Sequence, residues 1–311
     1  MILSNDGIPI IGVDVGYQFV KTANSIFPNG VTCLGSTEPS LKDNSLFYEG
    51  MFYKVGEGRE SITDSKIADG NARILTMVAI ARELRSNGIT SAEVVLVVGL
   101  PFSNYGREKQ DVINYYNKYP ELNFEYEGVR YHVVIRRTIC CPQCYSAIAP
   151  RLSNMIDGDY MIIDVGSKTS DIIFVQKGHP IESKSITVEH AMIKWIRYIQ
   201  GQLQIQYSRD IPEEEILKVL LNEKSLIPTE YSVLIKETMK ELIEEFELEL
   251  KERGYNLDYV NVIYVGGGAL VAKNYTKSVK NNHMYDCDLK ANAKGYEFLA
   301  STMIGRAGDV V

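Results

Sequence analysis

The sequence predicts a mixed α/β protein built from two similar halves. Apolar runs bounded by turn residues, which indicate strands, alternate with segments of helical periodicity. Residues 11–21 and 162–171 both contain a strand that ends in Asp-Val-Gly, and each has a charged residue seven positions after the Asp. The two copies lie 150 residues apart in a chain of 311, a length that suits two domains.

Each element is expected from a local pattern. Helix 71–87 has apolar residues at helical spacing and stops before Gly88, and helix 230–253 stops before Gly254. Further helices are expected at 104–118, 143–154, 189–204 and 212–223. Strands are expected at 9–15, 17–24, 94–99, 131–137, 160–165, 171–176 and 259–265. The Gly-rich and polar stretch 28–70 is interpreted as an insertion, a possible subdomain within the first half.

Composition and charge exclude several classes of protein. Apolar residues make up 45% and charged residues 23%, as in globular proteins. The net charge of −7 and the lack of a Lys/Arg tract argue against direct binding to DNA. We expect a cytoplasmic protein with no membrane contact, because the N-terminus has no basic region typical of a signal peptide and no apolar run reaches 18 residues.

The five cysteines include one pair at CxxC spacing, Cys141 and Cys144. Such a pair occurs in redox motifs and in half of a zinc site, but a zinc site needs further ligands. No second pair or nearby His run is present, so we expect reduced thiols packed between a loop and a helix.

The two Asp-Val-Gly turns are candidate phosphate-binding sites. A strand that turns at once after Asp-x-Gly exposes backbone N–H groups that bind anions, beside a carboxylate that can hold a metal. A single copy usually just closes a turn, but two copies could bind a polyphosphate from both sides with Mg²⁺ between Asp14 and Asp164. Lys21 would supply positive charge, with a solvated lysine as the alternative.

A third element is the apolar strand from Tyr259 that runs into Gly266, Gly267 and Gly268. Consecutive glycines let a phosphate or a flat ring approach the backbone at a helix start, although they also suit an ordinary tight turn. The order is not G-x-G-x-x-G, and no G-x-x-x-x-G-K-[ST] occurs in the chain. Rossmann dehydrogenases and P-loop NTPases are therefore excluded.

These three motifs in this order resemble the phosphate 1, phosphate 2 and adenosine motifs of the actin, Hsp70 and sugar-kinase superfamily. The segment from Val97 to Tyr105 is similar to that of the bacterial ParM/StbA plasmid-segregation actins and their Alp relatives. The resemblance implies duplicated ribonuclease-H-like domains with an interdomain nucleotide cleft. Domain I would be 1–150 plus a C-terminal helix at 290–311, with the insertion subdomain at about 28–70, and domain II would be 151–289.

The resemblance also implies roles for individual residues. Gln143 would orient the attacking water, and Asp164 would support that water and, with Asp14, the waters of Mg²⁺. The remaining phosphate and nucleotide contacts would come from Gly16, Tyr17, Lys21, Gly166, Ser167, Lys168, Thr169, Asp171, Gly266, Gly267, Gly268 and Ala269. Many relatives have glycines where this chain has Ser167 and Lys168, so a solvent-facing Lys168 is the alternative to a phosphate contact. The run Glu213–Lys218 would border the base or would be a solvated helix face.

The implied function is an ATPase, with GTP as the alternative nucleotide, that polymerises into filaments and segregates plasmid DNA. Its expected partners are copies of itself and a ParR-like DNA-binding adaptor, so that DNA is bound only indirectly. Two rival functions stay open because one fold serves many functions. One is a small-molecule kinase with Asp171 as its base, and the other is a non-polymerising nucleotide sensor or scaffold.

Overall fold

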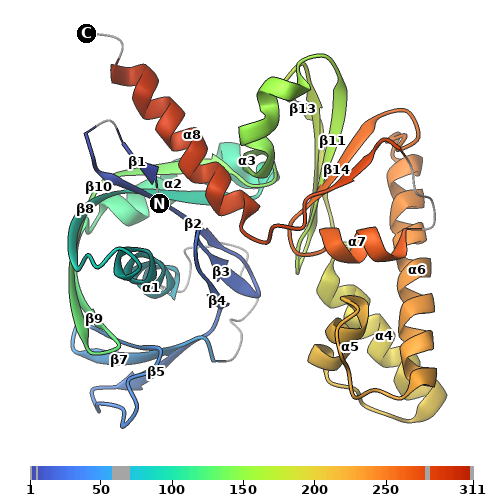
Figure 1. Ribbon diagram of the computed structural model, residues 1–311, viewed down its shortest axis with the longest axis horizontal. Helices are drawn as coiled ribbons and strands as arrows, with labels where there is room; N and C mark the ends of the chain where they lie inside the picture. The colour runs from blue at the N-terminus through green and yellow to red at the C-terminus, as the bar shows by residue number, and fades with distance from the viewer. Residues whose placement is uncertain (1, 5, 58–70, 277–280, 309–311) are drawn as a thin grey trace. The chain divides into compact units, whose positions relative to one another are not determined.

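The computed structural model describes residues 2–4, 6–57, 71–276 and 281–308. The chain divides into two compact units (Figure 1). Unit 1 comprises Met1–Pro150 and Lys290–Val311, and unit 2 comprises Arg151–Leu289.

The described residues of unit 1 form a ten-stranded sheet in the order β4-β3-β2-β8-β10-β9-β6-β7-β5, with β1 also paired to β2. The strands are β1 (Ile2–Leu3), β2 (Pro9–Val15), β3 (Phe19–Lys21), β4 (Ile26–Pro28), β5 (Val31–Gly35), β6 (Ser45–Tyr48), β7 (Met51–Val55), β8 (Ser91–Leu100), β9 (Glu121–Tyr126) and β10 (Val129–Pro142). At its centre β2, β8 and β10 are parallel, whereas the other pairings are antiparallel.

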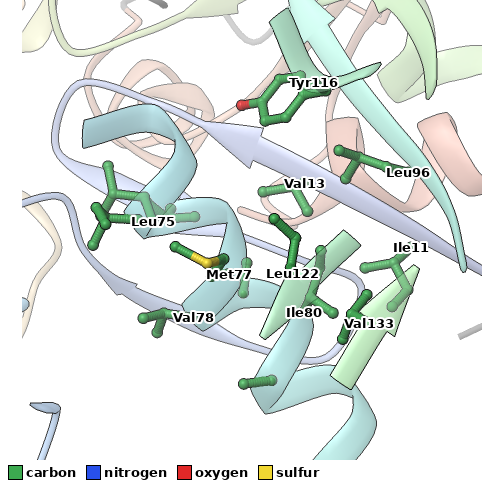
Figure 2. Close-up of a cluster of buried hydrophobic side chains, with 14 of the residues drawn as sticks. Ile11, Val13, Leu75, Met77, Val78, Ile80, Leu96, Tyr116, Leu122 and Val133 are labelled. Atoms are coloured by element: carbon green, nitrogen blue, oxygen red, sulfur yellow. The ribbon is translucent and has the colours of Figure 1, made fainter. Parts of the chain in front are cut away.

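The central strands of unit 1 are buried on both faces, which explains their continuous apolar sequences. One face packs against α1 (Asn71–Arg85) and α2 (Phe102–Asn117), and the sheet curves around α1 (Figure 1). Figure 2 shows side chains of α1, among them Leu75 and Ile80, packed against Ile11 and Val13 of β2. The other face packs against α8 (Ala291–Gly308) through Tyr296 and neighbouring apolar residues.

The expected insertion at 28–70 is part of this sheet as far as the structure describes it. Strands β5, β6 and β7 extend the sheet through the pairing of β6 with β9. Leu46 and Val55 belong to the main core of unit 1, so the described part of the insertion shares the core of the unit. Residues 58–70 of the expected insertion lie outside the described residues.

Unit 2 repeats the arrangement of strands found around β2. Its described residues form a five-stranded sheet in the order β13-β12-β11-β14-β15. The strands are β11 (Asp159–Val165), β12 (Ser170–Gln176), β13 (His179–Val188), β14 (Asn261–Val265) and β15 (His283–Tyr285). Strand β11 has an antiparallel partner on one side and a parallel partner on the other, as β2 does in unit 1. The duplication predicted from the Asp-Val-Gly repeat is therefore present in the strand pairing.

The helices of unit 2 are α4 (Met192–Tyr207), α5 (Glu213–Leu220), α6 (Thr229–Glu252) and α7 (Ala269–Tyr275). Apolar side chains of all four helices form one core with the sheet. The link between the central strands of the two units contains α3 (Tyr145–Ile148) and a 3-10 segment (Ala149–Met155). The continuous helix expected at 143–154 is therefore wrong, because Pro150 has no N–H to donate to the carbonyl of Ser146.

Candidate functional site

The first Asp-Val-Gly motif forms the tight turn between β2 and β3. Asp14 and Lys21 are directly paired across the two strands, which explains their spacing of seven. The N–H of Gly16 donates to the carbonyl of Phe19 at 3.0 Å, and a Cβ atom at Gly16 would lie 2.9 Å from that oxygen. A glycine is thus required here because the turn closes directly over its Cα atom.

Three of the predicted catalytic and phosphate-binding side chains meet in unit 1. Asp14 is only 2% exposed, and Lys21 Nζ lies 3.4 Å from its Oδ2 atom. Gln143, which directly follows β10, donates from Nε2 to Asp14 Oδ1 at 2.6 Å. The carboxyl ends of parallel strands lie at one edge of a sheet, so β2 and β10 bring residues 14 and 143 together. This contact fixes the orientation of the Gln143 carboxamide.

Two asparagines that the sequence analysis did not identify stabilise these loops. Asn29, after β4, donates from Nδ2 to the carbonyl of Gly16 at 2.5 Å. Its backbone N–H donates to the backbone carbonyl of Gln18 at 2.9 Å. Asn292 of α8 accepts the backbone N–H of Cys144 at 2.9 Å, directly after Gln143. Pro28-Asn29-Gly30 is a turn signal that could have drawn attention to Asn29, whereas Asn292 has no local signal.

The second Asp-Val-Gly motif forms the turn between β11 and β12 in unit 2. Asp164 and Asp171 are paired across the strands, and Gly166 N–H donates to Thr169 O at 3.0 Å. Asp171 is 7% exposed and accepts a 2.6 Å hydrogen bond from Thr187 of β13. The same turn signal therefore produces the same hairpin in each unit.

The beginning of α4 supports this second turn. The backbone N–H groups of Met192 and Ile193 donate to the carbonyls of Gly166 and Ser167, at 3.1 and 3.0 Å. Lys168 is exposed, and its positive charge helps to lower the pKa of Glu189, after the larger effect of the Lys194 hydrogen bond. The first turn of α4 thus fixes the backbone of this turn at residues 166 and 167.

The glycine-rich motif lies directly against the second hairpin. Because β14 is parallel to β11, Val265 is paired with Asp164. Gly266 has a φ of 78°, and a Cβ atom there would lie 2.1 Å from Asp164 Oδ1. Gly268 N–H donates to Val165 O at 2.9 Å, and a Cβ atom at Gly268 would lie 2.3 Å from the Val165 side chain. Two of the three motifs therefore meet in unit 2.

The remaining predicted residues have less specific surroundings. Tyr17, Ser167 and Thr169 are half-buried on their turns. Ala269 begins α7 and is fully buried, while a Cβ atom at Gly267 would approach only Leu289, at 3.7 Å. The structure thus requires glycine at positions 266 and 268, whereas position 267 has room for a side chain.

The carboxylates of Asp14 and Asp164 are suitable groups for magnesium, which prefers oxygen ligands and retains several waters. Asp14 already accepts hydrogen bonds from Lys21 and Gln143, so contact through water fits it better than direct ligation. Within the described residues, no cluster of three His, Cys, Asp or Glu side chains could hold a metal directly.

The CxxC pair and the acidic run have structural surroundings. Cys141 and Cys144 are buried, and burial raises the pKa of the Cys141 thiol to about 12, which disfavours the reactive thiolate. Lys218 contacts Glu214 and Glu215 on the same helix, and Glu215 also accepts from the 225–226 loop. Both features therefore have a structural explanation.

Each of the two units matches a known protein family. The family described as "Actin like proteins N terminal domain" matches residues 12–145. The family described as "Archaeal actin homologue MreB-like, C-terminal" matches residues 162–277. The chain is an actin-like protein. No curated protein sequence matches it.

Solved structures show the same actin-like fold over almost the whole chain. An archaeal actin homologue, Ta0583, in complex with ADP is 22% identical, with a TM-score of 0.69 over 95% of this chain and 100% of its own. ParM of Bacillus thuringiensis with ATP is 15% identical, with a TM-score of 0.69 over 96% and 99%. The Alp12 filament structure is 17% identical, with a TM-score of 0.67 over 94% and 98%. The predicted actin-like fold and its resemblance to ParM and Alp proteins are confirmed.

Proposed function

We propose that this actin-like protein is an ATPase whose two hairpins bind the phosphates of one Mg-nucleotide. The observation that carries the proposal is the contact of Asp14 with both Lys21 and Gln143. A carboxylate, a cation and an oriented carboxamide at one edge of the sheet match groups that recur in enzymes that transfer a phosphoryl group to water. Asp164 and the glycines packed against it form the corresponding part of unit 2.

Each side chain has a defined task in the proposed reaction. With Nε2 bonded to Asp14, the Gln143 carboxamide presents Oε1 as the acceptor that orients a water for in-line attack. Lys21 stabilises the negative charge that builds on the phosphoryl oxygens, and Asp164 supports the attacking water. A magnesium ion would be supported through water by Asp14 and Asp164 and would supply further charge stabilisation. Backbone N–H groups of the two turns and of the 266–268 loop complete the proposed phosphate contacts.

We also propose how the protein assembles and what its assembly does in the cell. The Alp12 relative was solved as a filament, and relatives were solved with ADP and with ATP. We infer that this chain polymerises head to tail in a nucleotide-dependent way, through heterologous contacts whose rotation does not close into a ring. A cytoplasmic filament with this net charge of −7 would segregate plasmid DNA through a ParR-like basic adaptor. No helix among the described residues combines the length and apolar character needed to cross a membrane.

Phosphate release from Mg-ATP and Mg-GTP tests the enzymatic proposal. We expect turnover without any added metabolite, and Gln143→Ala should slow it by about a hundredfold because the water loses its orienting group. The matched control is Gln110→Ala, which removes an exposed glutamine of α2 bonded to Asn114 and should leave turnover unchanged.

The possible outcomes separate the rival functions. Full turnover in Gln143→Ala would contradict the role of Gln143. Phosphate transfer that requires an added acceptor would instead support the small-molecule kinase. Nucleotide binding without turnover or polymer would support the sensor.

A further inference from the structure

A fully buried carboxylate lies beneath the turn that follows Lys21. Glu83 is on α1 and is 0% exposed. Its Oε1 atom accepts hydrogen bonds from the Thr22 hydroxyl and from the backbone N–H of Asn24, the latter at 2.9 Å. Its Oε2 atom accepts from Asn24 Nδ2 at 2.8 Å. All three donors therefore come from one short turn, 61 and 59 positions away in sequence.

The turn itself, residues 22–25, connects β3 to β4. Thr22 N–H donates to Ser25 O, and Ser25 N–H donates to the Thr22 hydroxyl oxygen, both at 2.9 Å. The Thr22 hydroxyl thus accepts from Ser25 while it donates to Glu83. The contact with Glu83 consequently fixes the internal bonds of the turn as well as its place on α1.

A carboxylate suits this place because its two oxygens accept all three hydrogen bonds, whereas the amide nitrogen of a glutamine could accept none. Burial of a carboxylate is unfavourable unless hydrogen bonds replace the lost water, so a carboxylate is used at a buried position only where donors surround it. An apolar residue would fill the same space but would leave the Thr22 hydroxyl and the Asn24 N–H without this acceptor. The hydrogen bonds that offset the burial of Glu83 are thus the same bonds that hold the 22–25 turn against α1.

The turn begins directly after Lys21, the last residue of β3. We propose that Glu83 is a positioning residue for Lys21: by binding the 22–25 turn, it fixes the end of β3 where the Lys21 ammonium group faces Asp14 and the nucleotide phosphates. The inference rests on the proposed function, since it assigns a phosphate contact to Lys21. Glu83 acts only through the turn and touches no nucleotide.

An exchange of donor and acceptor tests the contact directly. In Asn24→Asp a second carboxylate faces Glu83, and no rotation of the new side chain restores a hydrogen bond. In the double variant Asn24→Asp/Glu83→Gln the amide of residue 83 can donate to the carboxylate of residue 24, and the net charge returns to that of the natural chain. Asn24 is exposed, so these variants should stay folded.

The matched control restores net charge without restoring the contact. Glu127 accepts from Asn44 N–H at 2.8 Å and from Arg85, on a part of unit 1 remote in sequence from the turn. The control variant is therefore Asn24→Asp/Glu127→Gln. It shows whether any recovery arises from charge alone.

The first measurement is amide hydrogen exchange over residues 20–25 without nucleotide. We expect faster exchange in Asn24→Asp, recovery in Asn24→Asp/Glu83→Gln, and no recovery in Asn24→Asp/Glu127→Gln. The second is the affinity for Mg-ATP, which should fall about tenfold in Asn24→Asp, the equivalent of one lost hydrogen bond to a charged group. It should return to within about twofold in the double variant with Glu83→Gln.

The two measurements distinguish the two proposals. Unchanged exchange in Asn24→Asp, or equal recovery with Glu83→Gln and Glu127→Gln, would overturn the role of Glu83. Recovery of exchange without recovery of Mg-ATP affinity would show that the turn does not position a phosphate contact, which also overturns it. If the natural chain binds no Mg-ATP, the proposed ATPase function fails, and the exchange experiment still decides whether Glu83 fixes the turn.

Discussion

At the scale of single residues, the glycines of the 266–268 loop are not equivalent. Gly266 combines a φ of 78° with a Cβ position 2.1 Å from Asp164 Oδ1, whereas at Gly267 the nearest atom is 3.7 Å away. Any side chain at 266 would displace the carboxylate that we assign to the water and the metal. In the sequence the three glycines are identical, because the difference between them arises only from the contacts of the fold.

Gly266→Ala should therefore destabilise unit 2 and abolish turnover. We expect the free energy of unfolding to fall by about 1–3 kcal/mol, because alanine strains the backbone at this φ and clashes with Asp164. Gly267→Ala is the matched control, with an expected change within about 0.5 kcal/mol. Urea denaturation and phosphate release check both variants, and equal effects at the two positions would contradict the described packing.

Glu297 on α8 is a second residue with a measurable signature. The residue is 2% exposed, and its side chain lies against β2, where Oε1 accepts a hydrogen bond from the backbone N–H of Gly12 at 3.2 Å. Burial raises the pKa of the Glu297 carboxyl from 4.5 to about 7, and the nearby Glu83 carboxylate contributes to the increase. The folded state consequently retains this proton at pH values where the unfolded chain has lost it.

The sign of the resulting pH dependence follows from linkage. Between pH 4.5 and about 7 the folded state binds more protons than the unfolded state, so the contribution of Glu297 to stability decreases as the pH rises and is constant above this range. We expect Glu297→Gln to remove this decrease. Urea denaturation of both proteins at pH 5 to 8 measures the difference between them, and parallel pH profiles would contradict the buried, protonated carboxyl.

Contacts within one hairpin could be predicted from the sequence, whereas contacts between distant segments could not. The pairing of Asp14 with Lys21 follows from their spacing in one hairpin. Asn29, Glu83, Thr187 and Asn292 contact the hairpins or their neighbouring loops from other segments. Only Asn29 lies in a local turn signal, and that signal does not indicate its contact with Gly16. A hydrogen bond between distant segments leaves no periodic pattern in either one.

At the scale of secondary structure elements, the buried strands were predicted best. Strands β2, β8, β11 and β14 are apolar over several consecutive residues, and each lies within about three residues of its expected place. Strand β13, at the edge of its sheet, reads His-Pro-Ile-Glu-Ser-Lys-Ser and gives no apolar run. It was missed because an edge strand with solvent-facing polar residues has no signal in composition.

Helix α8 packs closely on α3 through a glycine. A Cβ atom at Gly295 would lie 1.8 Å from Ser146 O, so the two backbones are in direct contact. The same helix contributes Asn292, which bonds the loop after Gln143. The position of α8 is consequently connected to the position of Gln143.

Gly295→Ala should weaken this packing and lower the free energy of unfolding by about 1–3 kcal/mol, with slower phosphate release. Gly305→Ala is the matched control in the same helix, because no atom lies within 4 Å of its Cβ position. There alanine should stabilise by up to about 1 kcal/mol through helix propensity. Opposite signs for the two variants are expected in thermal or urea denaturation, whereas equal signs would contradict the described contact of α3 with α8.

At the scale of the whole molecule, the repeat was the decisive prediction. Two hairpins with the same turn chemistry predicted a duplicated α/β chain, and the fold confirms it with β3-β2-β8 in unit 1 and β12-β11-β14 in unit 2. Surface contacts between copies have no comparable pattern, since they depend on shape and charge over many scattered residues. Assembly is therefore tested by direct measurement.

The most direct test of the central claim is high-speed sedimentation of the purified protein with Mg-ATP, with Mg-ADP and without nucleotide, followed by negative-stain electron microscopy of the pellet. The proposed function predicts ordered filaments that appear with the triphosphate and are lost on conversion to the diphosphate. A protein that stays in the supernatant under all three conditions, over a range of salt and protein concentration, would contradict a nucleotide-dependent filament.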